Sequence, residues 1–462
     1  MIRSLIFPGN HYTNSPQRQR TAMQEIKVGL IGFGTVGSGL AETLYQQRQR
    51  LEKRSGISIR LAKVADIVID TLPEKFTDTE LTNDAMSIID DPEIDIVVEL
   101  IGGIEPAKTF LTKAINRGKH VVTANKALLS QHGMEIFQAA VKNRVEVGFE
   151  ASVGGGIPVI KALREGLVAN RIESIMGIMN GTANYILTRM TEEGIDFATV
   201  LQEAQDEGYA EADPTYDVEG IDTAHKLVIL ATMAYGMDIG LDDIATEGIS
   251  TIEPVDIEFA REFGYRIKLL AISRNHGDSI EARVHPTMVP ESHLLAAING
   301  AFNAIHFTGD TVGDVLLYGM GAGMMPTGSA VAADVMDIAR NIIFDAVGRV
   351  PALSYLPEHI AKRDITPLTQ LCCPYYFRIT AVDKPGVLSK ISGILSEHDI
   401  SIESVIQKGR RQKKGPVAIV MRTHHAREDA VAQAIDEIDA LDIVAAPTVR
   451  IRILADNSPC RD

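Results

Sequence analysis

The sequence predicts an α/β chain with a doubly wound parallel sheet, an α+β region and a small ferredoxin-like unit. From residue 26 to residue 149, short apolar runs alternate with helical patterns, as in parallel strands joined by helices. From residue 265 the apolar runs follow one another in pairs, which is typical of antiparallel strands. After residue 375 the order is strand, helix, strand, strand, helix, strand, which is the ferredoxin-like order.

Composition argues against several classes of function. With 462 residues, 45% of them hydrophobic and 23% charged, the chain is long enough for about three globular domains. Its formal net charge of −16 argues against a general nucleic-acid binder or a binder of anionic membranes. Three cysteines give no disulfide framework, and no apolar run approaches the roughly 20 residues of a membrane span. We therefore expect a cytoplasmic protein.

The first domain is expected at residues 25–155, after a polar tail (1–24) that we expect to be disordered; Met1 or Met23 could be the true start. A strand from residue 26 runs into G-F-G-T-V-G (32–37) and then into a helical pattern. The first glycine permits the tight turn, the second lets the backbone approach a pyrophosphate, and the third lets the helix pack on the strand. This context predicts a Rossmann-type NAD(P)-binding domain, and a glycine-rich turn without a ligand is the alternative.

The end of the second strand gives conflicting indications about the cofactor. The strand at 57–64 is followed by Ala65 and Asp66. An acid in this place favours a ribose hydroxyl and therefore NAD, whereas Lys63 could attract the 2′-phosphate of NADP. Both cofactors remain open.

Two later loops are candidates for ligand contact. Lys126 follows the strand at 120–123, at the edge where parallel sheets bind ligands; without that placement, a solvated loop lysine would be the default. Residues 150–158, E-A-S-V-G-G-G-I-P, could bring backbone carbonyls close to a cation or a cofactor, or could form a hinge between domains. Further on, N-G-T-A-N (180–184) predicts a tight turn that caps the next helix.

The stretch from Glu207 to Lys226 is the most polar part of the middle of the chain, with six carboxylates and one lysine. Asp213-Pro214 indicates a loop, and a helix should begin near Ile221. Asp222 and Lys226 are four residues apart, so they share a helix face that then becomes apolar. An exposed ion pair is one reading. The other is a lysine held for proton transfer, since partial burial lowers the pKa of a lysine.

The region 156–350 is expected to be a catalytic and oligomerisation domain. In its second half, G-M-G-A-G (319–323) again allows close backbone approach to a ligand. A helix is predicted at 329–347, and we expect it to pack back on the first domain. Three histidines lack metal-ligand spacing and are interpreted as structural: His285, His293 and His306.

A proline-rich linker (351–374) leads to the last unit, at 375–455. The turn D-K-P-G (383–386) starts a helix with one apolar face, and the basic run at 408–414 should be a solvated hairpin tip. Because none of the catalytic candidates lies in this unit, we expect it to fold as a separate module that the chemistry does not need.

Several motifs together resemble homoserine dehydrogenase of the type that carries a C-terminal ACT domain. The resemblance covers essentially residues 25–455, and its most specific motifs are those at 179–187 and 208–226. The motifs are G-F-G-T-V-G (32–37), V-V-E-L-I-G-G (97–103), T-A-N-K-A-L-L (123–129), E-A-S-V-G-G-G-I-P (150–158), M-N-G-T-A-N-Y-I-L (179–187), G-Y-A-E-A-D-P-T-Y-D-V-E-G-I-D-T-A-H-K (208–226) and D-K-P-G-V-L-S-K-I-S (383–392).

The resemblance implies interconversion of L-homoserine and L-aspartate 4-semialdehyde with NAD or NADP, in threonine, methionine and isoleucine biosynthesis. It makes Lys226 the proton donor or acceptor, makes Glu211 and Asp222 the substrate-binding acids, and places Lys126 by the nicotinamide and the substrate. It also implies L-threonine as effector at the ACT domain, and a homodimer or homotetramer. The implied cofactor contacts are Gly32, Phe33, Gly34, Thr35, Val36, Gly37, Ala65, Lys126, Gly321 and Gly323, and the implied sodium ligands, mostly backbone carbonyls, are Glu150, Val153, Gly155 and Ile157.

Elementary chemistry agrees with this reading. Hydride transfer to an aldehyde leaves an alkoxide, which a lysine ammonium stabilises and then protonates. A substrate α-ammonium needs acids, and the 207–226 stretch supplies them. The alternatives are a non-catalytic amino-acid and nucleotide sensor, which damaged catalytic residues would favour, and another NAD(P)-dependent dehydrogenase of a small amino or keto acid.

Overall fold

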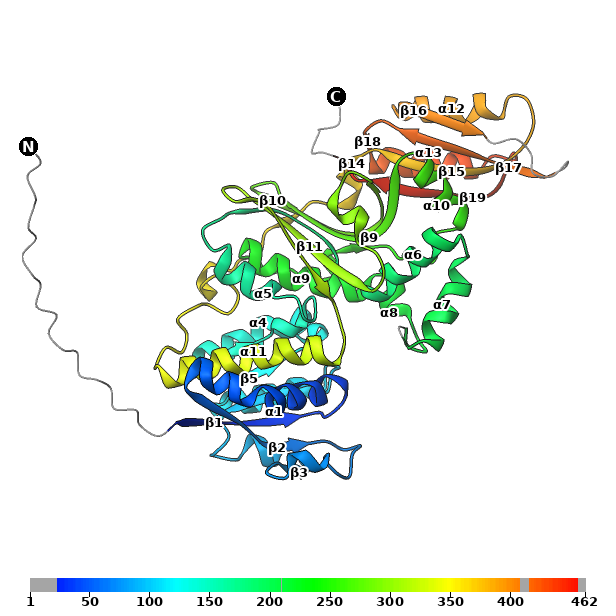
Figure 1. The fold of residues 1–462 in the computed structure, drawn as a ribbon. Helices are drawn as coiled ribbons and strands as arrows, with labels where there is room; N and C mark the ends of the chain where they lie inside the picture. Colours follow the sequence, from blue (N-terminus) through cyan, green and yellow to red (C-terminus); the bar gives the residue numbers. More distant parts are fainter. Residues whose placement is uncertain (1–22, 209, 408–414, 456–462) are drawn as a thin grey trace, which may run out of the picture.

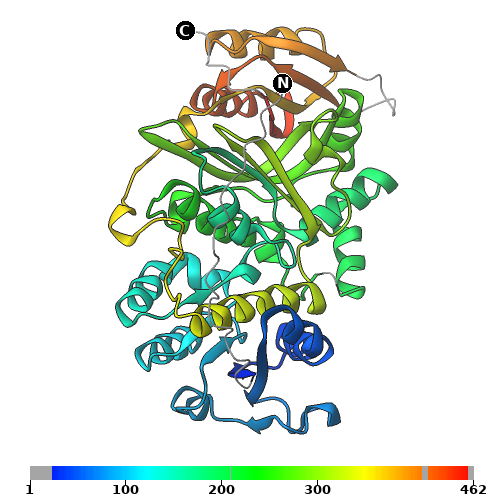
Figure 2. The ribbon, with the colours of Figure 1, turned by 60° about the vertical axis from the view of Figure 1, so that its left-hand side comes forward.

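The computed structural model describes residues 23–208, 210–407 and 415–455 (Figure 1). The N-terminal parallel sheet lies at one end of the molecule, the α+β region in the middle and the C-terminal unit at the other end (Figure 2). Residues 1–22 of the expected tail and the expected hairpin tip at 408–414 lie outside the described residues. Within the described ranges, no helix has the length and hydropathy needed to cross a membrane.

The N-terminal domain contains the predicted doubly wound sheet, with the strand order β3-β2-β1-β4-β5-β6 and every neighbouring pair parallel. Val97 belongs to the apolar core on one face and Val98 to the core on the other. Such strands are apolar on both sides because both faces are covered. The strands are β1 Gln24–Ile31, β2 Ile57–Ala65, β3 Glu80–Thr82, β4 Ile96–Glu99, β5 His120–Thr123 and β6 Val147–Gly148, and the helices are α1 Thr35–Ser55, α2 Met86–Ile89, α3 Ala107–Asn116 and α4 Lys126–Asn143.

Helix α11 (Met324–Ile343) returns from the middle of the chain and lies along α1 (Figure 1). It begins five residues before the expected helix at 329–347 and ends before it. The two helices touch at glycines: a Cβ at Gly39 would overlap Met324 O, and a Cβ at Gly328 would overlap the backbone of Gly39. This close approach joins the first domain to the glycine-rich turn that precedes α11.

The α+β region is built on antiparallel strands in the order β12-β11-β7-β9-β10. Helices α6 and α9 pack on this sheet, and α9 also packs on α4 of the first domain. The strands are β7 Ile172–Ile178, β8 Ala245–Thr246, β9 Tyr265–Asn275, β10 Ser279–Pro290, β11 Phe302–Gly309 and β12 Gly313–Met320; the helices are α5 Val159–Lys161, α6 Gly181–Glu193, α7 Phe197–Asp206, α8 Thr215–Val218, α9 Ile221–Tyr235 and α10 Pro254–Glu262.

The C-terminal unit has the predicted ferredoxin-like fold. Its sheet order is β19-β15-β17-β16, with α12 and α13 packed together over its own apolar core. The elements are β15 Tyr375–Val382, α12 Val387–Glu397, β16 Ile402–Gln407, β17 Pro416–Thr423, β18 Ala426–Arg427, α13 Glu428–Asp439 and β19 Val444–Ile453.

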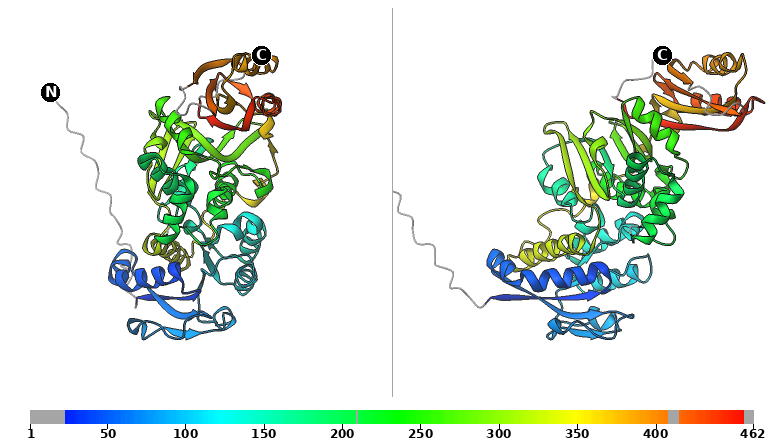
Figure 3. Two further views of the ribbon diagram at one scale, coloured as in Figure 1. Left: turned by 90° about the vertical axis from the view of Figure 1, so that its right-hand side faces the viewer. Right: turned by 45° about the vertical axis from the view of Figure 1, so that its right-hand side comes forward.

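The C-terminal unit shares a sheet with the α+β region. Strand β19 pairs in parallel with β10, through Thr287 with Arg452 and Met288 with Ile453. The preceding segment also contributes β13 (Asp364–Ile365), which pairs with β10, and β14 (Cys372–Cys373), which pairs with β18. Figure 3 shows the two regions stacked end to end. Residues 351–374, expected to be a linker, are thus partly built into the sheet.

Ion pairs reinforce this junction. Arg452, 2% exposed, binds Glu247 of the α+β region at 2.7 Å and Glu428 of the C-terminal unit at 2.6 Å. Arg378 binds the fully buried Asp256 at 2.7 Å, and the hydroxyl of Tyr376 donates to the same carboxylate. Buried charges of this kind are tolerated only when they are paired, so the two regions are held in a defined orientation.

Candidate active site

Three charged side chains meet near the N-termini of α4 and α9. Asp222 Oδ1 lies 2.9 Å from Lys126 Nζ, and Asp222 Oδ2 lies 2.6 Å from Lys226 Nζ. The side chains of Asp222 and Lys226 are only 6% and 10% exposed. The exposed ion pair that the spacing alone also allowed is therefore wrong, because the pair is buried.

Helix α9 sets this geometry. It begins at Ile221, as the sequence predicts, and Gly220 caps it with φ 80°, a left-handed conformation that favours glycine. The helix is buried from Asp222 to Tyr235, whereas the sequence pattern indicated one buried face. The difference arises because α9 lies between α4 and the sheet of the α+β region.

The two lysines differ in environment. Burial lowers the pKa of Lys226 below its ordinary value, although Asp222 opposes the shift. The charge of Asp222 raises the pKa of Lys126, whose side chain is 41% exposed. Lys226 also donates to Met179 O at 2.6 Å. Lys226 is thus the lysine suited to exchange a proton, while Lys126 stays cationic.

Asn180 holds the carboxylates of the site and was not singled out by the sequence. Its Nδ2 donates to Asp222 Oδ2 at 2.9 Å and to Asp217 Oδ1 at 2.6 Å. Its Oδ1 accepts from Ala183 N and caps α6, which is the only role that the sequence predicted. An asparagine followed by glycine and threonine signals a cap, and nothing in that pattern signals a contact with residues 217 and 222.

Glu211 lies at the edge of the cluster, where its charge adds to the effect of Asp222 and Asp217 in raising the pKa of Lys126. Its side chain is exposed on the loop before α8, and its backbone carbonyl accepts from Gln205 Nε2 at 3.0 Å. Tyr209 of this loop lies outside the described residues. The structure therefore brings Lys126, Asp222 and Lys226 into contact but leaves Glu211 at the protein surface.

The residues at 32–37 fit a dinucleotide. Gly32 has φ 98°, and a Cβ at Gly37 would overlap Gly32 O, so both positions require glycine. No atom of the described residues lies within 4 Å of a Cβ built at Gly34, which leaves its backbone open to a phosphate. Thr35 and Val36 open α1, whose N-terminus faces this turn. Gly32 N also donates to Ala65 O at 2.8 Å, which ties the turn to the end of β2.

The two other glycine-rich loops contact each other. A Cβ at Gly155 would overlap Gly321 O, and Gly156 N donates to Met320 O at 3.1 Å. A Cβ at Gly321 would overlap the side-chain amide of Asn303, which donates to the same Met179 carbonyl as Lys226 does. Gly323, with φ 117°, starts α11. The loops are thus connected to Lys226 through Asn303, another residue that the sequence did not single out.

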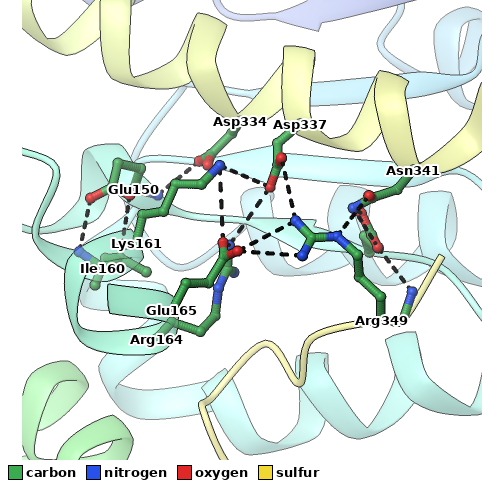
Figure 4. Close-up of polar contacts among 11 residues, drawn as sticks. Glu150, Ile160, Lys161, Arg164, Glu165, Asp334, Asp337, Asn341 and Arg349 are labelled. Atoms are coloured by element: carbon green, nitrogen blue, oxygen red, sulfur yellow. Dashed lines mark hydrogen bonds and ion pairs between the residues drawn. The ribbon is translucent and has the colours of Figure 1, made fainter. Parts of the chain in front are cut away.

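The carboxylate of Glu150 has a local role (Figure 4). Its oxygens accept from Ile160 N at 2.8 Å and Lys161 N at 2.9 Å, while its own backbone N donates to Asp334. Burial raises the pKa of Glu150 and raises the pKa of Asp334 to about 7. These two hydrogen bonds fix the Glu150 side chain against the start of α5.

His225 is a further buried polar residue beside the pair. Its Nδ1 lies within hydrogen-bonding distance of Ser130 Oγ on α4, and its ring stacks on Tyr216 with 6.0 Å between the ring centres. The contact with Ser130 places His225 on the side of α9 that faces the first domain. Burial lowers the pKa of His225, which favours a neutral imidazole. His225 thus joins α9 to α4, the two helices that supply the lysines.

Three family profiles match the chain. Residues 32–150 match "Homoserine dehydrogenase, NAD binding domain", residues 158–336 match "Homoserine dehydrogenase", and residues 375–442 match "ACT domain". The resemblance seen in the sequence motifs is thereby confirmed.

Relatives of known sequence and solved structure are similar to this chain over almost its whole length. A homoserine dehydrogenase of Pseudomonas aeruginosa is 47% identical over 93% of this chain and 99% of its own, and one of Bacillus subtilis is 39% identical over 91% and 96%. The crystal structure of a homoserine dehydrogenase from Thiobacillus denitrificans is 48% identical, with a TM-score of 0.88 over 94% of this chain and 99% of that one. The chain therefore belongs to the homoserine dehydrogenase family of NAD(P)-dependent oxidoreductases, and it carries a C-terminal ACT domain.

Proposed function

We propose that this chain interconverts L-homoserine and L-aspartate 4-semialdehyde with Lys226 as the group that exchanges the hydroxyl proton. The observation that carries the proposal is the buried carboxylate of Asp222, bound to one lysine of lowered pKa and one of raised pKa. These lysines lie beside loops that fit a dinucleotide. The integrity of the three side chains argues against a non-catalytic sensor.

A nicotinamide cofactor held by the glycine-rich turns would supply the hydride acceptor for the oxidation and the hydride donor for the reduction. In the oxidation, neutral Lys226 takes the proton of the substrate hydroxyl as the carbonyl forms. In the reduction, the ammonium of Lys226 stabilises the developing alkoxide and then protonates it. Asp222 holds Lys226 Nζ at 2.6 Å in a fixed orientation, together with Met179 O, so the lysine needs little reorganisation during the step.

We assign substrate binding to two acidic residues, Glu211 and Asp222, and to Lys126. We infer that Glu211 and Asp222 receive the α-ammonium of homoserine, with Glu211 reaching in from its exposed loop. Lys126, cationic and 41% exposed, is available to the substrate and the nicotinamide. Another small dehydrogenase substrate is the competing assignment, and the acid-rich loop supports a substrate with an ammonium group.

Cofactor binding is assigned to the glycine-rich turns described above. The proposed contacts come from the 32–37 turn, the end of β2, the start of α4 and the turn before α11, whose glycines permit the close approach that a dinucleotide needs. The proposed contact residues are Gly32, Phe33, Gly34, Thr35, Val36, Gly37, Ala65, Lys126, Gly321 and Gly323.

A sodium ion is proposed at the loop that contains two consecutive left-handed glycines, Gly154 (φ 72°) and Gly155 (φ 55°). Glycines in this conformation let the loop turn tightly with no side chain in the way, so that backbone carbonyls are available as ligands for a hard monovalent cation. The carbonyls proposed as ligands are those of Glu150, Val153, Gly155 and Ile157.

Regulation by L-threonine at the ACT domain is proposed because homoserine is its precursor. Gly386, with φ 88°, caps the eleven-residue helix α12, whose N-terminus suits a ligand carboxylate. Inhibition requires threonine to bind one conformational state better than another. We also propose a cytoplasmic homodimer or homotetramer; the exposed apolar side chains Tyr318 and Met320 of the edge strand β12 support assembly through the α+β sheet.

An absorbance assay at the nicotinamide band tests the activity. Purified full-length chain with L-homoserine and either dinucleotide should produce the reduced cofactor, whereas D-homoserine should not. Binding of the dinucleotide without turnover would support the sensor reading, and faster oxidation of a different hydroxy acid would support another dehydrogenase.

A further inference from the structure

We propose that the dinucleotide site of this chain selects NAD(H) over NADP(H), and that Asp66 is the residue that sets this selectivity. The inference rests on the proposed function of the Rossmann-type domain. It concerns the end of β2, where the sequence left the two cofactors open because Asp66 and Lys63 gave opposite indications.

Asp66 is fixed at the base of the dinucleotide turn. Its Oδ2 accepts from Phe33 N, inside the G-x-G-x-x-G turn, at 2.6 Å. Its Oδ1 accepts from Val68 N at 2.8 Å and from Ile69 N at 3.3 Å. Its own N donates to Thr82 O at 3.0 Å. The carboxylate therefore lies at the carboxyl end of β2, where a Rossmann-type domain places the adenosine ribose.

The bonding capacity of Asp66 leaves room for one ribose hydroxyl. An ionised carboxylate has about four acceptor positions, and three backbone N–H groups occupy three of them. The remaining position is on Oδ2, next to Phe33 N. A 2′-hydroxyl can donate to it, whereas a 2′-phosphate offers only acceptor oxygens and a charge near −2 at neutral pH.

Asp66 is negatively charged at neutral pH. Partial burial alone would raise its pKa, but the hydrogen bonds from Phe33, Val68 and Ile69 outweigh burial and lower the pKa below the ordinary value. A 2′-phosphate at this place would meet a like charge with no proton between them. Such juxtapositions cost affinity and are a common way of rejecting the wrong ligand.

The cations that could offset this charge are engaged elsewhere. Lys63 Nζ lies 2.8 Å from Asp91 and 3.5 Å from Glu80, and the bond to Asp91 raises the pKa of Lys63. Lys75, from the segment between β2 and β3, is ion-paired with Glu42 of α1. To bind a 2′-phosphate, either lysine would have to leave a carboxylate partner. The structure thus resolves the conflicting indications in favour of Asp66.

The test is direct titration of the full-length protein, without homoserine, with NADH and NADPH, followed by nucleotide fluorescence. The wild type should bind NADH at least about tenfold more tightly, and Asp66→Asn should narrow the ratio of the two dissociation constants several-fold. Asp70→Asn removes an exposed carboxylate of the same loop and should leave the ratio unchanged. Displacement of NADH from the wild type by 5′-AMP and by 2′,5′-ADP needs no variant, and 5′-AMP should displace it better.

Equal or tighter binding of NADPH by the wild type, or an unchanged ratio in folded Asp66→Asn, would overturn the selectivity. Better displacement by 2′,5′-ADP would overturn it as well. If neither dinucleotide bound, the proposed function itself would fail. If both bound equally and both supported homoserine oxidation, the selectivity would fail and the proposed function would stand.

Discussion

The side-chain amide of Asn180 donates to Asp222 Oδ2 at 2.9 Å, and the same nitrogen donates to Asp217 at 2.6 Å. One neutral donor therefore joins two carboxylates and keeps Asp222 between the two lysines. Asn180 and Lys226 donate to the same oxygen of Asp222, so Asn180 acts on Lys226 through this carboxylate, as a positioning residue.

Asn180→Asp separates this role from helix capping. Aspartate can still cap α6, but it replaces the shared donor by a third carboxylate beside Asp217 and Asp222. Because the lost hydrogen bonds to charged groups contribute about 1.5–3 kcal/mol and the added carboxylate is buried, we expect both the thermal midpoint and kcat for homoserine oxidation to fall, kcat by about 10- to 100-fold. The pH profile of kcat should also move, since an added carboxylate favours the ammonium form of Lys226.

The capping exchange has a control in the same protein. Asp196 caps α7 through Thr199 N, away from the site, so Asp196→Asn should leave kcat and its pH profile as in the wild type. Wild-type turnover in Asn180→Asp would mean that Asn180 is only a helix cap.

Asp222→Asn should shift the acid limb of the pH profile. The carboxylate of Asp222 raises the pKa of Lys226, so its loss lets burial lower that pKa further. In the proposed reaction, homoserine oxidation needs neutral Lys226, and the fraction of neutral lysine then reaches its maximum at a lower pH. We expect the limb to move to lower pH and kcat at the optimum to fall, because Lys226 loses its fixed partner. An unmoved limb, measured as kcat against pH at saturating homoserine, would show that another group titrates.

Much of this fold could be predicted from the sequence, because its signals are local. The turn at 32–37 and the alternation of strands and helices predicted the parallel sheet. The four-residue spacing of Asp222 and Lys226 predicted that they lie on one face of α9. The complete burial of α9 could not be read in the same way, since it depends on α4 and β9 closing over it. The same holds for Gly155 against Gly321, which are far apart in sequence and meet only in the folded chain.

The junction with the C-terminal unit shows a second limit. Prolines and missing periodicity between 351 and 374 indicated a linker, yet β13 of this segment pairs with β10. The sequence could not predict this pairing, because a strand of two residues leaves no periodic pattern. The ion pair of Arg452 with Glu247 could not be predicted from the sequence either, because residues far apart in the chain form ion pairs without any regular spacing.

This ion pair predicts a route for regulation. Glu247 binds Arg452 of β19, and the adjoining Gly248 and Ile249 pack against Glu219 and Val218, just before α9. If the ACT domain binds threonine, Glu247→Gln should raise the concentration for half-inhibition about fivefold or more and leave uninhibited turnover near the wild-type value. Glu253→Gln breaks another ion pair of the junction, with Arg378, and should change inhibition less. If the two substitutions changed threonine inhibition equally, the Glu247–Arg452 ion pair would have no specific role in regulation.

Lys226→Ala tests the central claim most directly, through kcat for oxidation of L-homoserine at saturating substrate. General acid-base catalysis contributes about 10²- to 10⁴-fold, so kcat should fall at least about a hundredfold. Fluorescence titration should show that the folded variant still binds the dinucleotide, because Lys226 lies with Asp222 and Met179 rather than in the 32–37 turn. Turnover within a fewfold of the wild type, in a variant that folds and binds cofactor, would contradict the assignment of Lys226 as the residue that exchanges the proton.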